Sequence, residues 1–349
     1  MTTIPSSPRR SRLRALPLAT LGLGLGLAPA CDDPAVDDIG EISQRDGQGE
    51  GGPTFNTNVI DTSDLPAIDT QGGTLDGVQL LNVVVVDNGS MVTVDSDSLR
   101  VHEGTIEGEV SGTTIDGFAF LGSVWTFDVD GTQVSMTLEQ IETSDDAGLY
   151  NPDDEVYLLK LDPDRLVYTF SYGESLTTVK TCEYDTVAGA RAVLYGDIYV
   201  DHGNGDITER DHTIYFGCLS GAVGKSALHG YAPDSPSKPS VTIDEFELAV
   251  RAVRADYCGN GTSYTNVGNA LTYDDRYDIN EHTEPFVTEA LWETGVGATC
   301  VNRIRSTGLI PSTGLNCGDR TITSCGSEKT EIAWGTGSHE LWTKVPNNY

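Results

Sequence analysis

The sequence predicts an α+β protein in which a β-rich N-terminal region of antiparallel hairpins packs with a disulfide-stabilised α+β C-terminal domain. Three observations predict this fold class. From about residue 74, short runs rich in β-branched residues alternate with Gly, Asn and Asp turns. Near residue 242 the pattern changes to that of a capped amphipathic helix. Beyond residue 180 lie six cysteines, an even number that can form three disulfides.

Residues 1–30 have the pattern of a signal peptide. Four arginines between positions 9 and 14 precede an apolar stretch, Ala15 to Leu27, that is too short and too rich in glycine to span a bilayer. The small residues Ala28-Pro29-Ala30 follow as a cleavage site. We therefore expect an exported protein, and no second apolar run is long enough for a membrane helix.

Cys31 follows this cleavage site directly. As the lipid-bearing first residue of a bacterial lipoprotein, Cys31 would anchor the chain to a membrane of the cell envelope, because two or three acyl chains give stable attachment. Ala28 and Pro29 also fit an ordinary cleavage site, so soluble secretion is the competing interpretation. It would leave Cys31 as a free thiol.

The composition excludes one class of partner. The chain has a formal charge of −32, and removal of residues 1–30, which hold four arginines and no acidic residue, takes the charge to −36. Such a chain repels the phosphates of nucleic acids, so we expect no binding to DNA or RNA. The acidic residues indicate a soluble surface, with specific binding of cationic partners as the alternative.

Residues 31–73 are predicted to form a flexible acidic tether. The segment is rich in Asp, Gly, Pro and Ser, and its few apolar residues follow no period. A flexible coil of this length spans roughly 35 Å root-mean-square, which would hold a domain clear of a membrane surface.

Residues 74–179 are predicted to be β-rich. Val83–Val86 and Met91–Val94 flank the turn Asp87-Asn88-Gly89, and a second hairpin has its turn at Asp130-Gly131. Two hairpins so close together favour an antiparallel sheet. The strands of the second hairpin and further strands are expected at Val124–Val129, Gln133–Leu138, Thr105–Val110, Phe118–Leu121, Val156–Leu161 and Leu166–Tyr172.

Residues 180–349 are predicted to form the mixed domain, with strands at Ala190–Val200 and His212–Cys218. Thr242 begins a capping box and a helix whose apolar residues recur at helical spacing as far as Tyr257. A second short helix is expected at Pro285–Glu293. The cysteines expected to form disulfides are Cys182, Cys218, Cys258, Cys300, Cys317 and Cys325, and the short loop between the last two favours their pairing.

The segment from Val253 to Thr265, which contains Ala255-Asp256-Tyr257-Cys258-Gly259, resembles the signature of the ADYC-domain family. The resemblance covers roughly residues 180–345. Its members are exported bacterial proteins, often lipoproteins, with no characterised activity. The resemblance therefore implies a fold and an extracytoplasmic location, but it brings no catalytic residue to this chain. Further matching segments are Phe216-Gly217-Cys218, Ser220-Gly221-Ala222, Gly230-Tyr231-Ala232-Pro233, Ala290-Leu291-Trp292 and Cys300-Val301.

Two departures from the family pattern stand out. Family members often carry cysteines at the position of Ser226 and near Ala249, and this chain has neither, which is what the loss of one disulfide would leave. Asp234 follows Pro233 where an aromatic residue is usual, and this puts any site built on that loop in doubt.

The signature itself offers candidate chemistry. Cys258 could act as a nucleophile, with Asp256 and His282 as orienting group and base. The structural interpretation, which export and the even number of cysteines favour, places Cys258 in a disulfide, packs Tyr257 and lets Asp256 bind the amides of the turn. Two other motifs fail on spacing: Gly224-Lys225-Ser226 lacks the first glycine of a phosphate-binding loop and reads as a turn, and Ser220 is one place late for a nucleophile elbow.

Metal sites receive little support from the sequence. The histidines and cysteines lack the spacing of a zinc site. The Gly-rich loop near residue 201 supplies oxygen ligands for calcium, although a solvated hairpin loop explains it better. A second acidic cluster, Asp274, Asp275, Asp278 and Glu281, could bind a cation or serve acid–base catalysis, but at this spacing it is more typical of an exposed turn. The calcium candidates are Asp201, Asp206, Glu209 and Asp211.

Two functions are consistent with these observations. The first is a cell-envelope lipoprotein that acts as a non-enzymatic binding or structural module with an unknown protein or envelope ligand and without a cofactor. The alternative is a secreted hydrolase that uses carboxylate and histidine chemistry, with Asp256, Asp274 and His282 as its candidate residues. A pocket in which these three side chains converge would favour the hydrolase.

Overall fold

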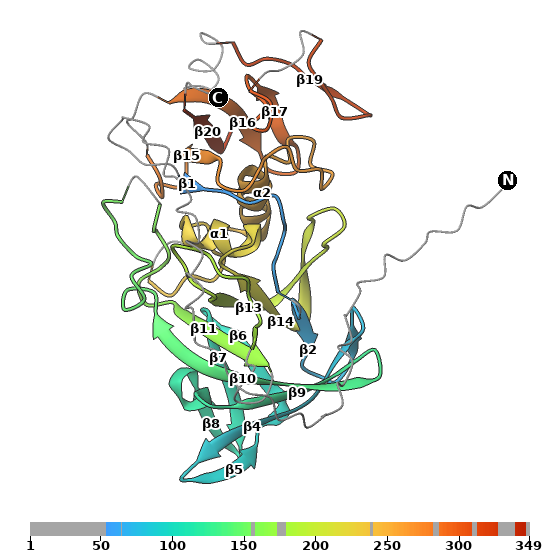
Figure 1. The fold of residues 1–349 in the computed structure, drawn as a ribbon, viewed down its shortest axis with the longest axis vertical. Coiled ribbons are helices and arrows are strands. Elements are labelled where there is room, and N and C mark those ends of the chain that lie inside the picture. The colour runs from blue at the N-terminus through green and yellow to red at the C-terminus, as the bar shows by residue number, and fades with distance from the viewer. Residues whose placement is uncertain are drawn as a thin grey trace, which may run out of the picture. The chain divides into compact units, whose positions relative to one another are not determined.

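The computed structural model describes residues 54–63, 65–154, 158–172, 179–237, 240–281, 286–308, 313–326 and 339–346. The expected signal peptide, Cys31, His282 and most of the predicted tether lie outside these residues. The described chain is mostly β-sheet, with helices and disulfides (Figure 1).

One sheet of ten strands dominates the fold. Its order is β2-β14-β13-β11-β10-β9-β4-β3, with β12 also paired to β11 and β5 to β4, and the pairs are antiparallel. The strands are β2 (Ala67–Asp69), β3 (Thr74–Leu75), β4 (Val78–Asp87), β5 (Ser90–Thr93), β9 (Val124–Val129), β10 (Thr132–Thr143), β11 (Leu166–Tyr172), β12 (Val179–Lys180), β13 (Ala192–Val200) and β14 (Ile207–Cys218).

Both faces of the central strands are buried. Side chains alternate between the faces of a strand, so neighbours such as Val193 and Leu194 belong to different cores. One core lies against a three-stranded sheet. That sheet consists of β6 (Asp95–His102), β7 (Thr105–Val110) and β8 (Thr113–Asp116), followed by the 3-10 helix η1 (Gly117–Phe120).

The second core lies between the large sheet and a five-stranded sheet, and the two α-helices of the described chain occupy the layer between them (Figure 1). The helices are α1 (Ala222–Leu228) and α2 (Ile243–Arg254). The order of the five-stranded sheet is β1-β15-β20-β16-β17. Its strands are β1 (Thr54–Phe55), β15 (Ala270–Asp275), β16 (Val287–Glu293), β17 (Gly297–Val301) and β20 (Leu341–Val345), and β18 (Leu315–Asn316) and β19 (Thr321–Ile322) form a separate pair.

Most of the predicted elements are confirmed. The two hairpins are β4–β5 and β9–β10, and the turn residue Asn88 has the positive φ of 48° that its hairpin requires. The expected strands at 105–110 and 166–172 are β7 and β11, and those at 190–200 and 212–218 are β13 and β14. Helix α2 begins with the predicted capping box, in which the Thr242 hydroxyl accepts from Glu245 N and the Glu245 carboxylate accepts from Thr242 N.

Two strand predictions were wrong. The expected strand at Phe118–Leu121 is the 3-10 helix η1, because Gly117 has a φ of +42° and Phe120 O accepts from Ser123 N, so the chain turns there. The described part of the segment at Val156–Leu161, residues 158–161, contains only an isolated bridge from Lys160 to Tyr150.

Two predictions around the helices were also wrong. Within the segment expected as a helix, Pro285–Glu293, residues 287–293 form strand β16, which pairs with both β17 and β20; pairing on two sides outweighs the local helical pattern. Gly224-Lys225-Ser226, expected as a turn, lies inside α1. A Cβ at Gly224 would lie 2.2 Å from Cys218 O, so glycine lets the helix approach β14 closely.

The boundaries of the predicted regions differ from those of the structure. The tether was expected to extend to residue 73, whereas residues 54–55 and 67–69 are already strands paired to β15 and β14. The boundary at residue 180 falls inside the ten-stranded sheet, where Tyr168 of β11 pairs with Ala192 of β13. Strands this short show no alternation of apolar and polar residues, so the start of the folded chain was predicted too late.

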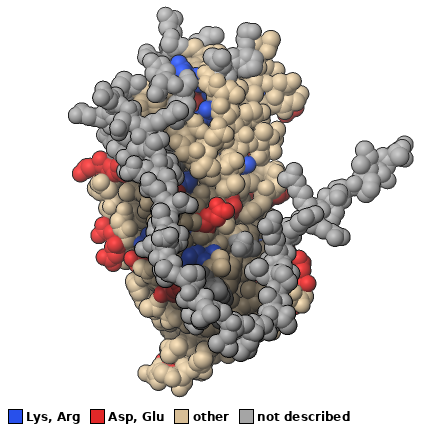
Figure 2. Space-filling model, in the orientation of Figure 1, with Lys and Arg blue, Asp and Glu red and all other residues tan. Residues whose placement is uncertain are grey.

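The described residues contain three disulfides and no helix that is long and apolar enough to cross a membrane. Three disulfides indicate an exported protein, because such bonds persist in oxidising compartments. Figure 2 shows exposed groups of acidic side chains on the face drawn there, as the formal charge of −32 predicts.

Candidate functional site: the turn after helix α2 and its cleft

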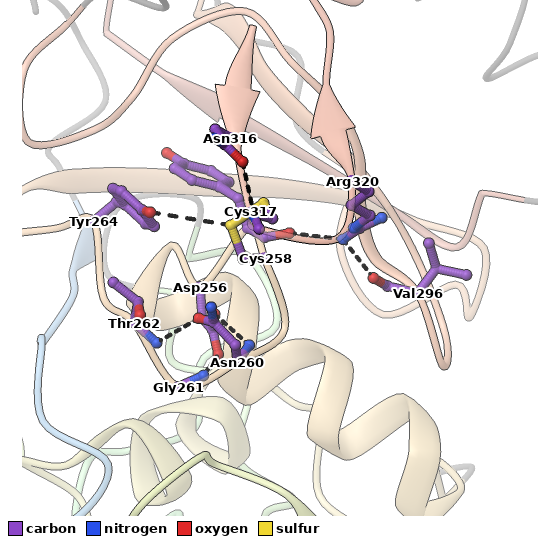
Figure 3. The surroundings of a disulfide bond; sticks show 12 residues. Asp256, Cys258, Asn260, Gly261, Thr262, Tyr264, Val296, Asn316, Cys317 and Arg320 are labelled. Atoms are coloured by element: carbon purple, nitrogen blue, oxygen red, sulfur yellow. Dashed lines mark hydrogen bonds between the residues drawn. A yellow bond between two sulfur atoms is a disulfide. The ribbon is translucent and has the colours of Figure 1, made fainter.

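The disulfides pair Cys182 with Cys218, Cys258 with Cys317, and Cys300 with Cys325. All six cysteines that the sequence expected to pair are therefore paired. The expected pairing of Cys317 with Cys325 was wrong: the two residues flank a short loop, but each one bonds to a different neighbouring segment. Cys258–Cys317 lies at the end of α2 (Figure 3).

Helix α2 ends because Ala255 adopts a left-handed conformation with a φ of 53°. The chain then forms the α2 turn, residues 255–261, which contains the signature tetrapeptide. Gly261 has a φ of +83°, and a Cβ there would lie 2.6 Å from Asn204 Cα. Both the backbone angle and the lack of space therefore require glycine at the last position of the turn.

Asp256 organises the α2 turn from the inside. Its fully buried carboxylate accepts hydrogen bonds from Asn260 N at 3.1 Å and Gly261 N at 2.8 Å (Figure 3). It also forms an ion pair with the Arg251 guanidinium, 2.9 Å away. This is the structural role that the sequence favoured for Asp256, and it leaves the carboxylate fully engaged in the turn.

Tyr257 connects the α2 turn to the five-stranded sheet. Its buried hydroxyl donates to Glu289 Oε1 at 2.6 Å and accepts from Arg305 N at 3.0 Å. The ring stacks on Trp292, with 5.6 Å between ring centroids. Burial and the neighbouring Glu289 carboxylate raise the pKa of Tyr257 well above its ordinary value, so the phenol stays neutral and can donate.

An ion pair between Glu289 and Arg305 lies behind Tyr257, and both side chains are 0% exposed. Arg305 contacts the carboxylate through two nitrogens, Nε to Oε1 and Nη2 to Oε2, each at 2.8 Å. Its guanidinium also donates to the carbonyls of Ala252 and Val253, in the last turn of α2. Burial alone would lower the pKa of Arg305, but Glu289 beside it raises the pKa, so the guanidinium keeps its charge.

Arg320 fixes the outer side of the α2 turn. Its Nη2 donates to Tyr257 O at 3.1 Å and to Val296 O at 2.7 Å, which joins the turn to the loop between β16 and β17 (Figure 3). Cys258 Sγ lies 4.0 Å from the hydroxyl of Tyr264. Each of the residues Asp256, Tyr257 and Cys258 thus binds a different segment of the fold.

Arg251 stands at the centre of a cluster of carboxylates. Its guanidinium contacts Glu247 on the same helix at 2.9 Å, Asp206 from the β13–β14 loop at 2.6 Å, and the buried Asp256. Burial would lower the pKa of Arg251, but Glu247 and Asp256 outweigh it and raise the pKa. Arg254 is a second cation close enough for Asp256 and Arg251 to affect its pKa, so the three carboxylates face two guanidinium groups.

A cleft of about 190 Å³ opens beside this cluster. Asp244, in the first turn of α2, adds a fourth carboxylate and is exposed. Residues 295–297, between β16 and β17, also line the cleft. The cleft is polar and negatively charged, so its walls favour a cationic group. Its lining residues are Asp206, Asp244, Glu247, Leu248, Arg251, Gly259, Gly295, Val296 and Gly297.

The residues nominated for hydrolysis do not share this cleft. Asp256 lies behind it with Arg251, whereas Asp274 is on β15 and forms an ion pair with Lys344 of β20. His282 lies outside the described residues. In the second acidic cluster Asp275 is not exposed as expected: it accepts from Tyr231 OH at 2.6 Å, and burial raises the pKa of its carboxyl.

The predicted calcium ligands serve the hairpin loop instead. The Asp201 carboxylate accepts from Gly203 N at 2.7 Å, and Asp206 binds Arg251. Glu209 and Asp211 are exposed on β14, so the segment is the solvated hairpin loop that the sequence favoured. Within the described ranges, no group of three or more His, Cys, Asp or Glu residues is placed to hold a metal ion.

The structure shows where the residues that depart from the family pattern lie. Ser226 and Ala249 are both fully buried on the contacting helices α1 and α2, which is where a disulfide between these helices would be expected. Asp234 holds the neighbouring β6–β7 turn, since its carboxylate accepts from Glu103 N at 2.5 Å.

Sequence reasoning missed Arg251, Glu289 and Arg305. Glu247 and Arg251 are four residues apart on α2, and this spacing predicts an ion pair on a helix. No comparable signal exists for Glu289 and Arg305, which are 16 residues apart on different segments.

A family model described as the ADYC domain matches residues 117–307, more than half of the chain. The match contains both helices, the α2 turn and the strands from β9 to β17. It begins before the residue 180 that the resemblance suggested and ends before Cys317 and Cys325. Searches of curated proteins and of solved structures find no match.

Proposed function

The chain belongs to the ADYC-domain family, and from the way its signature residues are used we propose that it is a non-enzymatic module of the cell envelope. In this proposal the protein is exported, its lipidated Cys31 attaches it to a membrane, and the domain binds a protein or envelope ligand without a resident cofactor. The alternative remains a secreted hydrolase that uses carboxylate and histidine chemistry.

One observation carries the proposal. The polar groups of the signature are all committed to structural partners: Asp256 to the turn amides and Arg251, Tyr257 to Glu289, and Cys258 to Cys317. A nucleophile needs a free thiol or hydroxyl with a base within reach, and a general base needs an accessible lone pair. The signature residues therefore stabilise the fold of the domain, and this favours a structural or binding role.

The cleft beside Arg251 suggests the chemical class of ligand. Asp244 is exposed on its rim, and Glu247 and Asp206 share a single guanidinium. A lysine or arginine side chain of a protein partner would complete the charge balance. Exposed charges at a rim contribute modestly to affinity and more to the rate of association, so we expect weak binding that weakens further with salt.

Binding of a pentalysine peptide, measured by isothermal titration calorimetry at low salt, tests this site. We expect Asp244→Asn to weaken binding by about threefold, as the loss of one exposed ion pair predicts. The matched control is Asp97→Asn on β6, which removes the same charge from a residue that does not line the cleft. Equal affinities for the two variants would show that only the net charge attracts the peptide, and would remove the cleft from the proposal.

The anchor has its own test. Non-reducing peptide mass mapping of the protein extracted from its native envelope should find lipid on Cys31 and a peptide that links Cys258 to Cys317. An unmodified Cys31 would refute the anchor and leave a soluble exported module. A free Cys258 thiol would instead revive the hypothesis that Cys258 is a nucleophile.

A further inference from the structure

The first described segment of the chain runs from the five-stranded sheet to the ten-stranded sheet. This segment, which we call the strap, consists of residues 54–63 and 65–69. At one end β1 pairs with β15 in the five-stranded sheet, and at the other end β2 pairs with β14 in the ten-stranded sheet (Figure 1). The strap therefore supplies an edge strand to two sheets that are otherwise separate.

Between these strands the backbone of the strap is held by the helix layer. The carbonyls of Val59 and Ile60 accept from Ala222 N and Val223 N, at the start of α1. Arg254 of α2 donates through Nε to Asn58 O at 3.4 Å. The contact is close, because a Cβ at Gly221 would lie 2.6 Å from the Cα of Asp61.

Asp61 is the ionisable group at the centre of this contact. Its carboxylate accepts from Ser63 N at 2.8 Å, Tyr215 OH at 3.1 Å and Cys218 N at 3.4 Å. The Tyr215 hydroxyl also lies 2.9 Å from Nε2 of His202. Asp61 is partly buried, and since His202 is exposed on the β13–β14 loop, two hydrogen bonds also connect its carboxylate to solvent.

The groups around Asp61 provide no compensating positive charge. The phenol of Tyr215 on β14 donates to Asp61. The phenol of Tyr195 on β13 lies close enough for the charge of Asp61 to raise its pKa. Lys225 of α1 is paired with Asp185, and Arg254 of α2 binds carbonyl groups. In the described chain Asp61 has no ion pair.

We propose that the strap is a pH-sensitive clasp between the two sheets, with Asp61 as its proton-binding group. A proton on Asp61 can be donated to the Tyr215 oxygen, while the Tyr215 hydroxyl turns to donate to neutral His202. Loss of that proton leaves a partly buried carboxylate without a counter-ion. The strap then binds less tightly, and the edges of β14 and β15 become available to other extended chains.

The direction of the pH dependence follows from the position of Asp61. Burial outweighs the hydrogen bonds and raises its pKa from 3.8 to about 7. An acid whose pKa is raised by folding favours the closed strap when protonated, and this contribution is lost as the pH rises from about 4 through 7. With these two pKa values, the equilibrium constant for closing of the strap falls about tenfold between pH 6 and pH 8.

Hydrogen–deuterium exchange on the full chain tests the clasp. Exchange of peptides from the strap and from the start of α1, corrected for intrinsic rates, should show about a tenfold increase in opening between pH 6 and pH 8. Peptides from β10 and β11 provide the internal reference. Equal pH responses in the strap and the reference strands would overturn the proposal.

Two variants identify the proton-binding group. Asp61→Asn should abolish the pH dependence, whereas Asp69→Asn on the same strap should preserve it. If Asp61→Asn does not fold, Tyr215→Phe serves instead: the hydrogen bond that it removes from the ionised carboxylate is stronger than the one that it removes from the protonated acid, so the transition should move to higher pH. An Asp61→Asn variant whose strap opens with the wild-type pH dependence, or a Tyr215→Phe transition that stays in place, refutes the assignment.

Discussion

Replacement of Glu289 by glutamine is expected to lower the free energy of unfolding by about 3–5 kcal/mol, as for other buried ion pairs that lose one partner. The substitution keeps the shape of the side chain but leaves the Arg305 guanidinium buried without a counter-ion. The amide keeps one oxygen that can accept from Tyr257, but its NH2 group replaces the carboxylate oxygen that accepts from Arg305 Nη2. Chemical denaturation in urea with two independent spectroscopic probes measures the change.

Glu139→Gln is the matched control. Glu139 pairs with Lys180, but both side chains are about one third exposed or more, so the loss should be about 0–1 kcal/mol. If the Glu289 variant were no less stable than the Glu139 variant, the buried pair would not hold α2 to the five-stranded sheet. A double variant, Glu289→Leu with Arg305→Met, should recover part of the loss because no buried charge remains unpaired.

Local signals in the sequence explain which elements could be predicted. The β4–β5 hairpin depends on Asn88 and Gly89, whose positive φ angles of 48° and 78° are those of a two-residue turn. The start of α2 depends on Thr242 and Glu245, three residues apart. In both cases the residues that determine the structure are neighbours in the chain.

The elements that were predicted wrongly depend on distant partners. The segment at 287–293 has helix-forming residues, yet it is a strand because β17 and β20 lie on either side of it. The strap has strands of two and three residues, too short for an alternating pattern, and is defined by Leu271 and Ile214, more than 140 residues away. Such pairings are tertiary and leave no periodic trace in the sequence.

The candidate site also combines features that local sequence predicts with features that depend on distant residues. A turn stabilised by Asp256 could be predicted, because Asp256, Tyr257 and Cys258 follow a capped helix. The partners of these residues could not be predicted, because Glu289 and Cys317 are 32 and 59 residues away in the chain. The net charge predicted an acidic surface, but not that Arg251 would gather three carboxylates beside one cleft.

Replacement of Cys258 by serine is expected to destabilise the protein by about 4 kcal/mol, because the disulfide to Cys317 closes a loop of 59 residues and restricts the unfolded chain. The bond also joins the α2 turn to the segment that carries Arg320, so its loss should loosen that side of the turn. Thermal unfolding under oxidising conditions measures the change. A reductant should destabilise the wild-type protein at least as much, because it can also reduce the other two disulfides.

The double variant Cys258→Ser with Cys317→Ser separates the bond from the thiol that a single substitution leaves behind. If the disulfide is what stabilises the turn, the double variant should be as unstable as the single one, since both lack the same cross-link. If the single variant is unstable only because free Cys317 forms wrong disulfides, the double variant should melt near the wild type. Iodoacetamide should not label Cys258 in the native protein. Labelling, together with a normal melting temperature for Cys258→Ser, would mean that this sulfur is free and would make the nucleophile hypothesis the better explanation of the signature.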